Sequence, residues 1–435
     1  MSFGTLGLVF ALGLFSLLLM GLPVAFALGI TGLIGIMTAG GNDAWITLTS
    51  GAALHHMSHF GFLAIPLFIL MSTYITESGI GARLIDAATK WMSKLPGYLH
   101  SASIAACGGF SALSGSSIAT AAAIGGVVLP EIKRRGHSMR LGMGAVAAGG
   151  TLGMLIPPSN HFILYGVITE TSISQLFVAG IVPGIMLITA FIAFNLIIFS
   201  LKPSLAPRSE QGAEITWAQR WMALRQVWTA VVLIVAVVGG IFFGVVTPTE
   251  AAGLGALAAL LLGMFALRGL DLKQAHQAAI RAVQVTAMLG LIILGGLILG
   301  RGMALLNLSN DLVRWISESG MSPWEVMIVI NFILLFLGLM MDAAAITLIT
   351  VPLLFPVVVA LGFDPIWFGV VFCINMELAL ITPPVGINLF VIKAITGEPM
   401  KDVIIGVLPY ALILAAGLVL VMVIPGIALW LPGTM

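Results

Sequence analysis

The stretch GGFSALSGSSIATAAAIGGVV, residues 108–128, combines small apolar residues with several hydroxyl groups and carries no charge. It lies in a longer apolar segment, 98–130, that is interrupted at 113–117. Each half is too short to cross a hydrocarbon core of about 30 Å at a rise of about 1.5 Å per residue. We therefore expect a re-entrant helical hairpin, whose tip is tolerated at membrane depth because it is buried in protein or lines a cavity.

The whole composition is that of a polytopic, all-α membrane protein. Hydrophobic residues make up 60% of the 435 residues and charged residues only 8%, against about 25% charged residues in soluble domains. The net charge of +1 indicates no nucleic-acid partner, whereas a lipid bilayer is required. Cys107 and Cys373 are isolated in apolar sequence, so neither a disulfide framework nor a metal site is expected.

The first apolar run is interpreted as a membrane span rather than a signal peptide, because no basic residue precedes it. The expected conventional or broken spans are 4–20, 23–39, 61–79, 138–155, 160–200, 226–246, 250–267, 284–303, 365–381 and 385–424.

A second interrupted apolar segment, 324–361, breaks at 339–342 and predicts a second hairpin. Ser116 in the first tip and Asp342 in the second are 226 residues apart. The same offset relates further helix-breaking residues: Pro130 and Pro356, Gly136 and Gly362, Pro157 and Pro383, Pro158 and Pro384, Gly180 and Gly406, Pro183 and Pro409. This offset predicts an internal repeat.

The basic residues orient the two copies. All lysines and arginines except Arg301 and Arg314 fall on one side if 98–130 opens to the cytoplasm and 324–361 opens outward. This arrangement obeys the positive-inside rule and gives the copies opposite topologies. Inverted-topology repeats with discontinuous helices are typical of secondary transporters.

Four regions follow from this division. Residues 1–97 are expected to form scaffold spans and a first interfacial arm at 80–95, and residues 98–201 a first transport repeat. Residues 202–321 would supply a polar linker at 202–222, more scaffold spans and a second arm at 308–319; residues 322–435 would form the second transport repeat. The arms are predicted from their amphipathic pattern.

Each copy also contains a Pro-Pro pair, in LIPPSNHF and LITPPVGIN. Two consecutive prolines unwind a helix because proline lacks a backbone donor and clashes with the preceding turn. Freed carbonyls together with Ser, Thr and Asn oxygens suit a hard cation such as Na⁺, and inward-facing helix N-termini suit an anion. The four interruptions therefore predict an ion and substrate site.

Several polar residues leave alternatives open. Asp342 at membrane depth costs about 2.5–3.5 kcal/mol on insertion scales, so we expect it to bind a cation or a proton, with a purely structural hydrogen bond as the alternative. Glu377 is expected in a polar contact with Asn375, without a settled role. Arg301 either snorkels to the interface, which is favoured, or binds substrate. The group His55, His56 and His59 is a weak candidate for a metal site.

Other classes of function have less support. No G-x-x-x-x-G-K-[ST] loop is present, which argues against ATP hydrolysis by this chain. A membrane-embedded enzyme using Ser116 or Asp342 with His161 is the rival hypothesis. A channel and a stand-alone ion or anion transporter without partners are further alternatives.

Three strings resemble the large membrane subunit of tripartite ATP-independent periplasmic (TRAP) transporters. They are SGSSIATAAAIGGVVLPEIKRRG at 114–136, AAGGTLGMLIPPSNHFILYGVITETSISQLFVAGIVPG at 147–184 and NMELALITPPVGINLFVIKAI at 375–395. The resemblance implies a non-enzymatic, sodium-coupled elevator transporter of small organic acids in the bacterial inner membrane, with a fold like that of the ion transporter superfamily. It also implies a small four-helix membrane subunit and a periplasmic substrate-binding protein as partners, and no cofactor besides the coupling Na⁺.

The resemblance further implies individual residues. One sodium site would use Ser114, Gly115, Ser116, Ser117, Pro157, Ser159 and Asn160. The other would use Asp342, Ala343, Thr382, Pro384, Gly386 and Asn388. The substrate would contact Ser116, Ser117, Asn160, His161, Asp342 and Asn388. Its identity, the number of coupled ions and the oligomeric state are not predicted.

Overall fold

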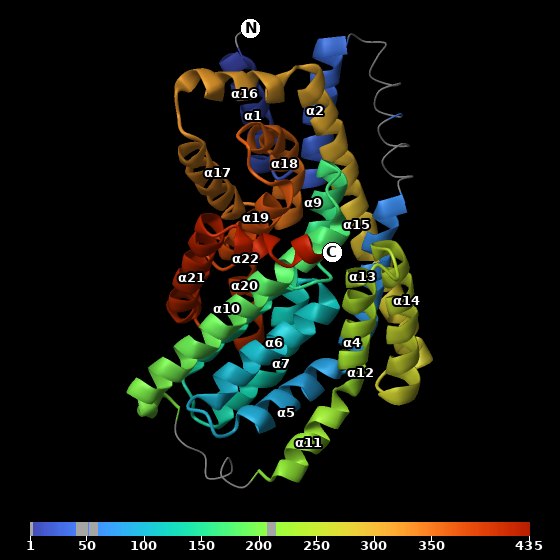
Figure 1. The fold of residues 1–435 in the computed structure, drawn as a ribbon, viewed down its shortest axis with the longest axis vertical. Helices are drawn as coiled ribbons and strands as arrows, with labels where there is room; N and C mark the ends of the chain where they lie inside the picture. The colour runs from blue at the N-terminus through green and yellow to red at the C-terminus, as the bar shows by residue number, and fades with distance from the viewer. Residues whose placement is uncertain (1–2, 41–50, 52–59, 207–214) are drawn as a thin grey trace.

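The computed structural model describes residues 3–40, 51, 60–206 and 215–435, and every regular element in these ranges is helical (Figure 1). Among the described residues, five helices are long and apolar enough to cross a membrane, or up to seven if each of two bent pairs is one span. The five are Ile173–Leu201, Pro248–Ala266, Leu272–Leu305, Ala343–Ala360 and Met400–Val423. The chain is therefore an all-helical, multi-span membrane protein with broken helices. His55, His56 and His59 lie outside the described residues.

One group of helices packs around the long helix α15, Leu272–Leu305. The group comprises α1 (Phe3–Leu19), α2 (Val24–Gly40), α4 (Ala64–Glu77) and α14 (Pro248–Leu261). Helices α2 and α15 approach to backbone contact, since a Cβ on Gly32 would lie 2.4 Å from the Leu299 nitrogen. Small residues at such crossings allow close packing of membrane helices. Helix α15 begins earlier than the span expected at 284–303, so that span prediction was too short.

The first interrupted segment forms a helical hairpin. Helix α6 is Tyr98–Ser114 and α7 is Ser117–Arg134, and the turn between them uses Gly115 with a φ of +60°. At the open end, the Arg135 guanidinium donates a hydrogen bond to the Tyr98 hydroxyl at 2.6 Å. The two ends of the segment therefore meet, as the sequence predicts.

The second interrupted segment forms the corresponding hairpin from α17 (Pro323–Gly338) and α18 (Ala343–Ala360). Its open end is closed by the rings of Trp324 and Phe363, whose centroids are 5.3 Å apart. Helix α18 has 18 residues and satisfies the length and hydropathy expected of a span. The argument that both arms are too short was therefore wrong for this arm, and the contact at the open end is what defines the hairpin.

Both Pro-Pro pairs interrupt helices. Helix α8 (Met139–Thr151) continues as one 3₁₀ turn, Leu152–Met154, before the break, and α9 (Asn160–Thr169) follows it. The equivalent pieces are α19 (Pro365–Leu380) and α20 (Ile387–Thr396). The Pro157–Pro158 and Pro383–Pro384 peptide bonds are both cis. Long helices follow each break, α10 (Ile173–Leu201) and α21 (Met400–Val423).

The helix bounds repeat at the offset found in the sequence. Helix α7 becomes α18, and α8 with its 3₁₀ turn becomes α19, when 226 is added to their first and last residues. The second half of each broken helix packs on the hairpin of the other copy, α9 on α18 and α20 on α7. The two copies are thus interlocked rather than side by side.

Contacts at one end of the molecule also join the copies. Lys133 pairs with Glu398 at 3.0 Å and Arg140 pairs with Asp402 at 2.7 Å. Helices α8 and α21 touch through their backbones, because a Cβ on Gly144 would lie 2.0 Å from the Gly406 oxygen. Basic residues from both copies therefore share one face.

The two amphipathic arms lie at opposite ends of the long axis. Helix α16 (Leu308–Ser319) crosses the top of Figure 1, whereas α5 (Ile80–Met92) lies near the bottom. The helix pair Gly61–Glu77 and Ile80–Met92 is bent by 65°, so α5 turns away from the preceding helix.

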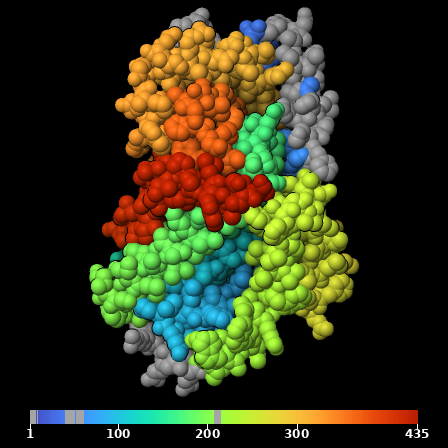
Figure 2. All heavy atoms as spheres, viewed as in Figure 1, coloured from blue at the N-terminus to red at the C-terminus, as the bar shows by residue number. Residues whose placement is uncertain are grey.

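The expected polar linker 202–222 is partly a helix, which corrects the sequence prediction. Helix α11 (Trp217–Gln226) packs on α5, and the Trp91 indole donates a hydrogen bond to the Arg220 carbonyl at 3.1 Å. Helices α12 (Trp228–Ile234) and α13 (Gly240–Phe242), joined by a π-helical turn, continue the chain after a 50° bend. Figure 2 shows the C-terminal residues, with α22 (Gly426–Leu429), across the middle of one face beside α10.

The contact between α8 and α21 makes a stability prediction. Gly406→Val should lower the midpoint of thermal unfolding of the purified protein, because its Cβ would lie 1.9 Å from the Arg140 oxygen. Overpacking of this kind costs about 1–3 kcal/mol. Gly126→Val is the control, since a Cβ there meets nothing within 4 Å. An equal midpoint for the two variants would contradict the close approach.

Candidate functional site

The first hairpin tip lies directly against the first Pro-Pro break. A Cβ on Gly115 would lie 2.4 Å from the Pro158 oxygen, and a Cβ on Gly153 would lie 2.6 Å from the Ser116 oxygen. Both contacts require glycine, since no real Cβ tolerates such distances. The structure therefore brings the first predicted residue group together. Gly153 completes the contact and was missed from the sequence, where it is one of many glycines.

The hydroxyl groups of the first tip form a small network. The Ser114 and Thr120 hydroxyl oxygens are 2.9 Å apart, and the Thr120 hydroxyl donates to the Ser116 carbonyl at 2.9 Å. Ser116 in turn caps α7 by accepting from the Ala119 nitrogen at 3.4 Å. Thr120 was absent from the predicted site, although its position four residues after Ser116 places it on the first turn of α7.

Two polar side chains of the first group remain uncommitted. Ser159 is occupied, since its hydroxyl donates to the Met154 carbonyl and accepts from the Phe162 nitrogen at 3.3 Å. By contrast, the Ser117 and Asn160 side chains make no hydrogen bond to the residues that the structure describes. Their oxygens, with the carbonyls of the unwound 155–158 segment, can offer ligands to a hard cation.

The second tip has a carboxylate where the first has a hydroxyl. Asp342 Oδ1 accepts hydrogen bonds from the backbone nitrogens of Ala344 at 3.0 Å and Ala345 at 3.1 Å. Asp342 is therefore the N-cap of α18, which begins at the buried Ala343. The structural role considered from the sequence is present, and it occupies only one carboxylate oxygen.

The second tip contacts its own broken helix through apolar residues. A Cβ on Gly338 would lie 2.3 Å from the Ala379 Cβ. Ala379 is 226 residues after Gly153, so the same position of the broken helix touches the tip in both copies. These close contacts at the second tip run through Gly338 and Ala379 rather than through the predicted ligand Asp342.

The second break offers oxygens of its own. The Thr382 hydroxyl donates to the Leu378 carbonyl at 2.6 Å, which leaves its lone pairs available. Asn388 donates to the Ala147 carbonyl at 3.4 Å, while its Oδ1 is buried without a partner among the described residues. Gly386 has a φ of +51° at the start of α20, a conformation that favours glycine.

The two breaks differ in accessibility. Pro157 and Pro158 are at most half-buried to fully buried, whereas Pro383 and Pro384 are exposed. The first group is therefore enclosed by protein, and the second opens to the surface.

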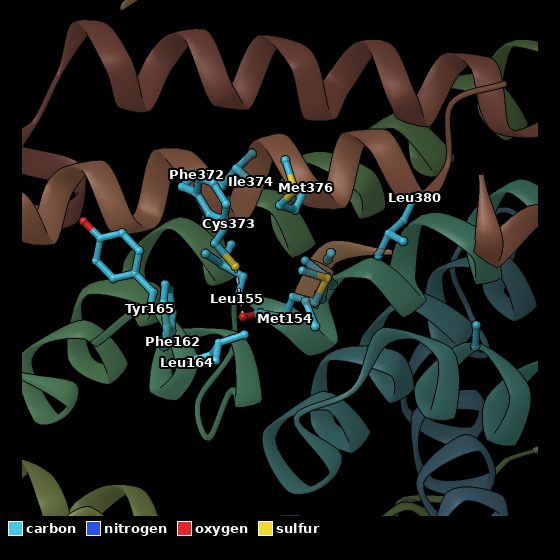
Figure 3. Close-up of a cluster of buried hydrophobic side chains, with 14 of the residues drawn as sticks. Met154, Leu155, Phe162, Leu164, Tyr165, Phe372, Cys373, Ile374, Met376 and Leu380 are labelled. Carbon is cyan, nitrogen blue, oxygen red and sulfur yellow. Dashed lines mark hydrogen bonds between the residues drawn. The ribbon is translucent and has the colours of Figure 1, made fainter. Parts of the chain in front are cut away.

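The first break also packs against α19 (Figure 3). The Cys373 thiol donates to the Met154 carbonyl at 3.0 Å. Glu377, one turn later, is fully buried, and neither carboxylate oxygen has a hydrogen-bond partner among the described residues. The expected contact between Glu377 and Asn375 was wrong, because the Asn375 amide donates instead to Asn331 Oδ1 at 2.9 Å.

The predicted substrate residues fall into the same two groups. Ser116, Ser117, Asn160 and His161 lie at the first tip and break, whereas Asp342 and Asn388 lie at the second. His161 Nδ1 is buried without a partner in the described structure. Ser116 makes no hydrogen bond to His161 there, so the nucleophile and base pair of a hydrolase is not formed.

Four helices begin at these interruptions, namely α7, α9, α18 and α20. Helix N-termini carry partial positive charge, which attracts anions. The arrangement therefore combines oxygen ligands for a cation with backbone dipoles that favour an anion.

Comparison with known proteins gives a consistent result. Residues 11–427 match the model of the family described as "Tripartite ATP-independent periplasmic transporter, DctM component". The chain is 38% identical to the C4-dicarboxylate TRAP transporter large permease protein DctM of Pseudomonas aeruginosa, over 86% of each chain. It is 36% identical to the DctM protein of Rhodobacter capsulatus, over 96% of this chain and 97% of that one.

Relatives with other printed substrates are also similar. The sialic acid TRAP transporter large permease protein SiaM of Vibrio cholerae is 31% identical, over 99% of this chain and 97% of its own length. Among solved structures, the YdaH transporter of Alcanivorax borkumensis has a TM-score of 0.63 at 13% identity, with 91% of this chain and 90% of that chain covered. That likeness supports the fold alone.

The cap and ligand roles of Asp342 can be separated by substitution. Asp342→Asn should keep the thermal stability, because asparagine caps helices as well as aspartate, whereas Asp342→Ala should lose about 0.5–2 kcal/mol. If the carboxylate also binds sodium, Asp342→Asn should weaken the stabilisation by NaCl relative to choline chloride, which reports affinity for the folded state. We expect a loss of at least about tenfold in Na⁺ affinity, or about 1.4 kcal/mol.

Asp364 provides the matched control. It caps α19 in the same way, with Oδ1 accepting from the Ile366 and Trp367 nitrogens at 2.8 and 2.9 Å. Asp364→Asn should leave both stability and sodium response unchanged. An Asp342→Asn protein with the wild-type sodium response would restrict Asp342 to capping.

Proposed function

Because the chain belongs to the family of the DctM component of TRAP transporters, we propose that it is the translocating subunit of a sodium-coupled importer of small organic acids. Membership of a permease family decides against the membrane-embedded enzyme considered from the sequence. The observation that supports the proposal most strongly is the contact of the first hairpin tip with the first Pro-Pro break, 2.4 Å from a Gly115 Cβ to the Pro158 oxygen.

Sodium is the coupling ion that the donors suit best. Hydroxyl, amide, carboxylate and carbonyl oxygens at two unwound segments form the kind of site that coordinates Na⁺ in transporters. Among the described residues, no group of three or more His, Cys, Asp or Glu side chains suggests a transition metal. Two sites are proposed, with the residues predicted above, and no cofactor besides the ion.

The substrate class is proposed from relatives. Their printed names include C4-dicarboxylate and sialic acid, and both are organic acids. The helix N-termini at the two tips supply the partial positive charge that a carboxylate requires. A four-helix membrane subunit and a periplasmic binding protein are the proposed partners, and the bacterial inner membrane the proposed location. A stand-alone transporter or a channel is the alternative.

Transport is proposed to occur by an elevator mechanism between two bodies. We call α6–α10 together with α17–α21 the transport bundle, and α1, α2, α4 and α12–α15 the scaffold. The bundle is expected to move as one body because the interlocked copies and the Lys133–Glu398 and Arg140–Asp402 ion pairs connect it. The hairpins would be re-entrant and the copies inverted, and α5 and α16 would link the two bodies.

Uptake by the reconstituted system tests the function. Proteoliposomes containing this chain and its membrane partner, with the binding protein outside, should import succinate or N-acetylneuraminate against a gradient only when Na⁺ is higher outside. Uphill import should stop when choline replaces Na⁺. Downhill flux that ignores the Na⁺ gradient would favour a channel, and import without either partner would favour the stand-alone alternative.

A disulfide can test the relative motion of the two bodies. A Cβ on Gly300 of α15 would lie 3.6 Å from the Pro352 Cβ of α18, a separation that suits a disulfide. Oxidised Gly300→Cys/Pro352→Cys protein should lose at least about nine-tenths of its uptake and recover it on reduction, because the scaffold is then tied to the bundle.

Gly149→Cys beside the native Cys107 is the control. Its Cβ would lie 2.9 Å from the Cys107 Cβ, so the link joins α8 to α6 inside the bundle. Uptake should survive oxidation in this variant. Full uptake by the oxidised Gly300→Cys/Pro352→Cys protein would rule out the elevator while leaving the transporter class intact.

A further inference from the structure

A cavity of about 310 Å³ lies between the scaffold helix α15 and two helices of the bundle, α9 and α18. Its lining includes Ile168 and Thr169 at the end of α9, Gly300 and Arg301 on α15, and Pro352 and Phe355 on α18. Arg301 is the charged residue of this lining. The cavity therefore presents a single cation at the interface between the two proposed bodies.

The guanidinium of Arg301 has no partner among the residues that the structure describes. Neither an ion pair nor a hydrogen bond engages this exposed side chain. On the same helix, Arg281 pairs with Glu77 at 2.7 Å, and on α16 Arg314 lies 3.8 Å from Asp311. Arg301 is thus an uncompensated cation at a membrane-embedded interface, unlike these two arginines.

The position of the cavity relates it to the ion and substrate site. Helix α18 starts at the Asp342 tip, and the cavity lies along its residues 348–356, about 9–21 Å farther along the helix at a rise of about 1.5 Å per residue. Helix α9 starts at the first break and reaches the cavity at its last residues. The cavity is therefore at the ends of these helices that point away from the candidate site.

That end is the outer one if the proposed topology holds. Arg301 and Arg314 are the only basic residues assigned to the outer side, where several acids lie. A partner-free guanidinium in a low-dielectric cleft attracts anions and raises their local concentration. Its planar fork matches a carboxylate through two parallel hydrogen bonds.

We propose that Arg301 is a carboxylate-capture residue, which holds the carboxylate of the transported acid in the cavity between α15, α9 and α18 on its way to the hairpin tips. The proposal rests on the proposed function, because it names how that substrate is recognised. Since α15 belongs to the scaffold, the contact with Arg301 is made on the outer side and is broken when the bundle moves inward.

The charge of the cavity can be measured without knowing the substrate. Ala304 is exposed, lines the same cavity and lies one turn after Arg301, and the native Cys107 and Cys373 are buried. Ala304→Cys should react faster with the anionic sulfonatoethyl methanethiosulfonate than with the cationic trimethylammonioethyl reagent. Adding Arg301→Gln should lower this ratio by about tenfold, the lower end of electrostatic focusing.

Arg314→Gln is the control and should leave the ratio unchanged, since Arg314 is close to Asp311. An unchanged ratio in the Arg301→Gln protein would overturn the proposal. That result is also expected if a lipid phosphate neutralises the guanidinium, so it separates lipid binding from capture of the acid.

Uptake kinetics give the second readout. With succinate, or with N-acetylneuraminate if that acid is imported instead, Arg301→Gln should raise KM at least about tenfold, or about 1.4 kcal/mol. The Na⁺ concentration for half-maximal uptake should stay unchanged, and Arg301→Lys should be intermediate because it keeps charge without the fork. A wild-type KM in Arg301→Gln would overturn the proposal, whereas absence of Na⁺-driven uptake in the wild type would refute the proposed function instead.

Discussion

A backbone polar group that leaves a helix inside a membrane must find a partner in the protein, since lipid offers none. This constraint applies four times here, at two hairpin tips and two Pro-Pro breaks. Each first-copy interruption is closed by a hydroxyl cap, Ser116 for α7 and Ser159 for α9, and Asp342 performs the same task for α18. The tip and break then cover each other, as the Gly115 and Pro158 contact shows. The remaining helices provide the protein environment that these segments need.

The same caps explain why the candidate ligands differ in availability. Ser159 and one oxygen of Asp342 are used to start helices, whereas the side chains of Ser117 and Asn160 and Asn388 Oδ1 are left without hydrogen-bond partners in the described structure. Buried polar atoms without partners are costly and are rarely left so without a function. The account therefore assigns ion binding to the second set, and helix capping to the first.

Much of the fold could be predicted because helix-breaking residues act locally. Glycines, prolines and polar caps at a constant offset of 226 residues located both hairpins, both breaks and the repeat. Tertiary contacts could not be predicted in this way. Helix α11 was taken for linker because its tryptophans and arginines look like solvated sequence, whereas Arg220 is buried against α5. Similarly, Asn375 pairs with Asn331 across helices, a choice that depends on packing rather than on sequence neighbours.

The central claim is that each tip and break pair holds a monovalent cation. Crystals of the complex grown with thallium(I) in place of sodium measure this directly through anomalous scattering. The account predicts two peaks, one beside Ser117 and Asn160 and one beside Asp342 and Asn388, and both should weaken when excess sodium is added. No peak at either position, in a protein that imports its substrate with sodium, would contradict it.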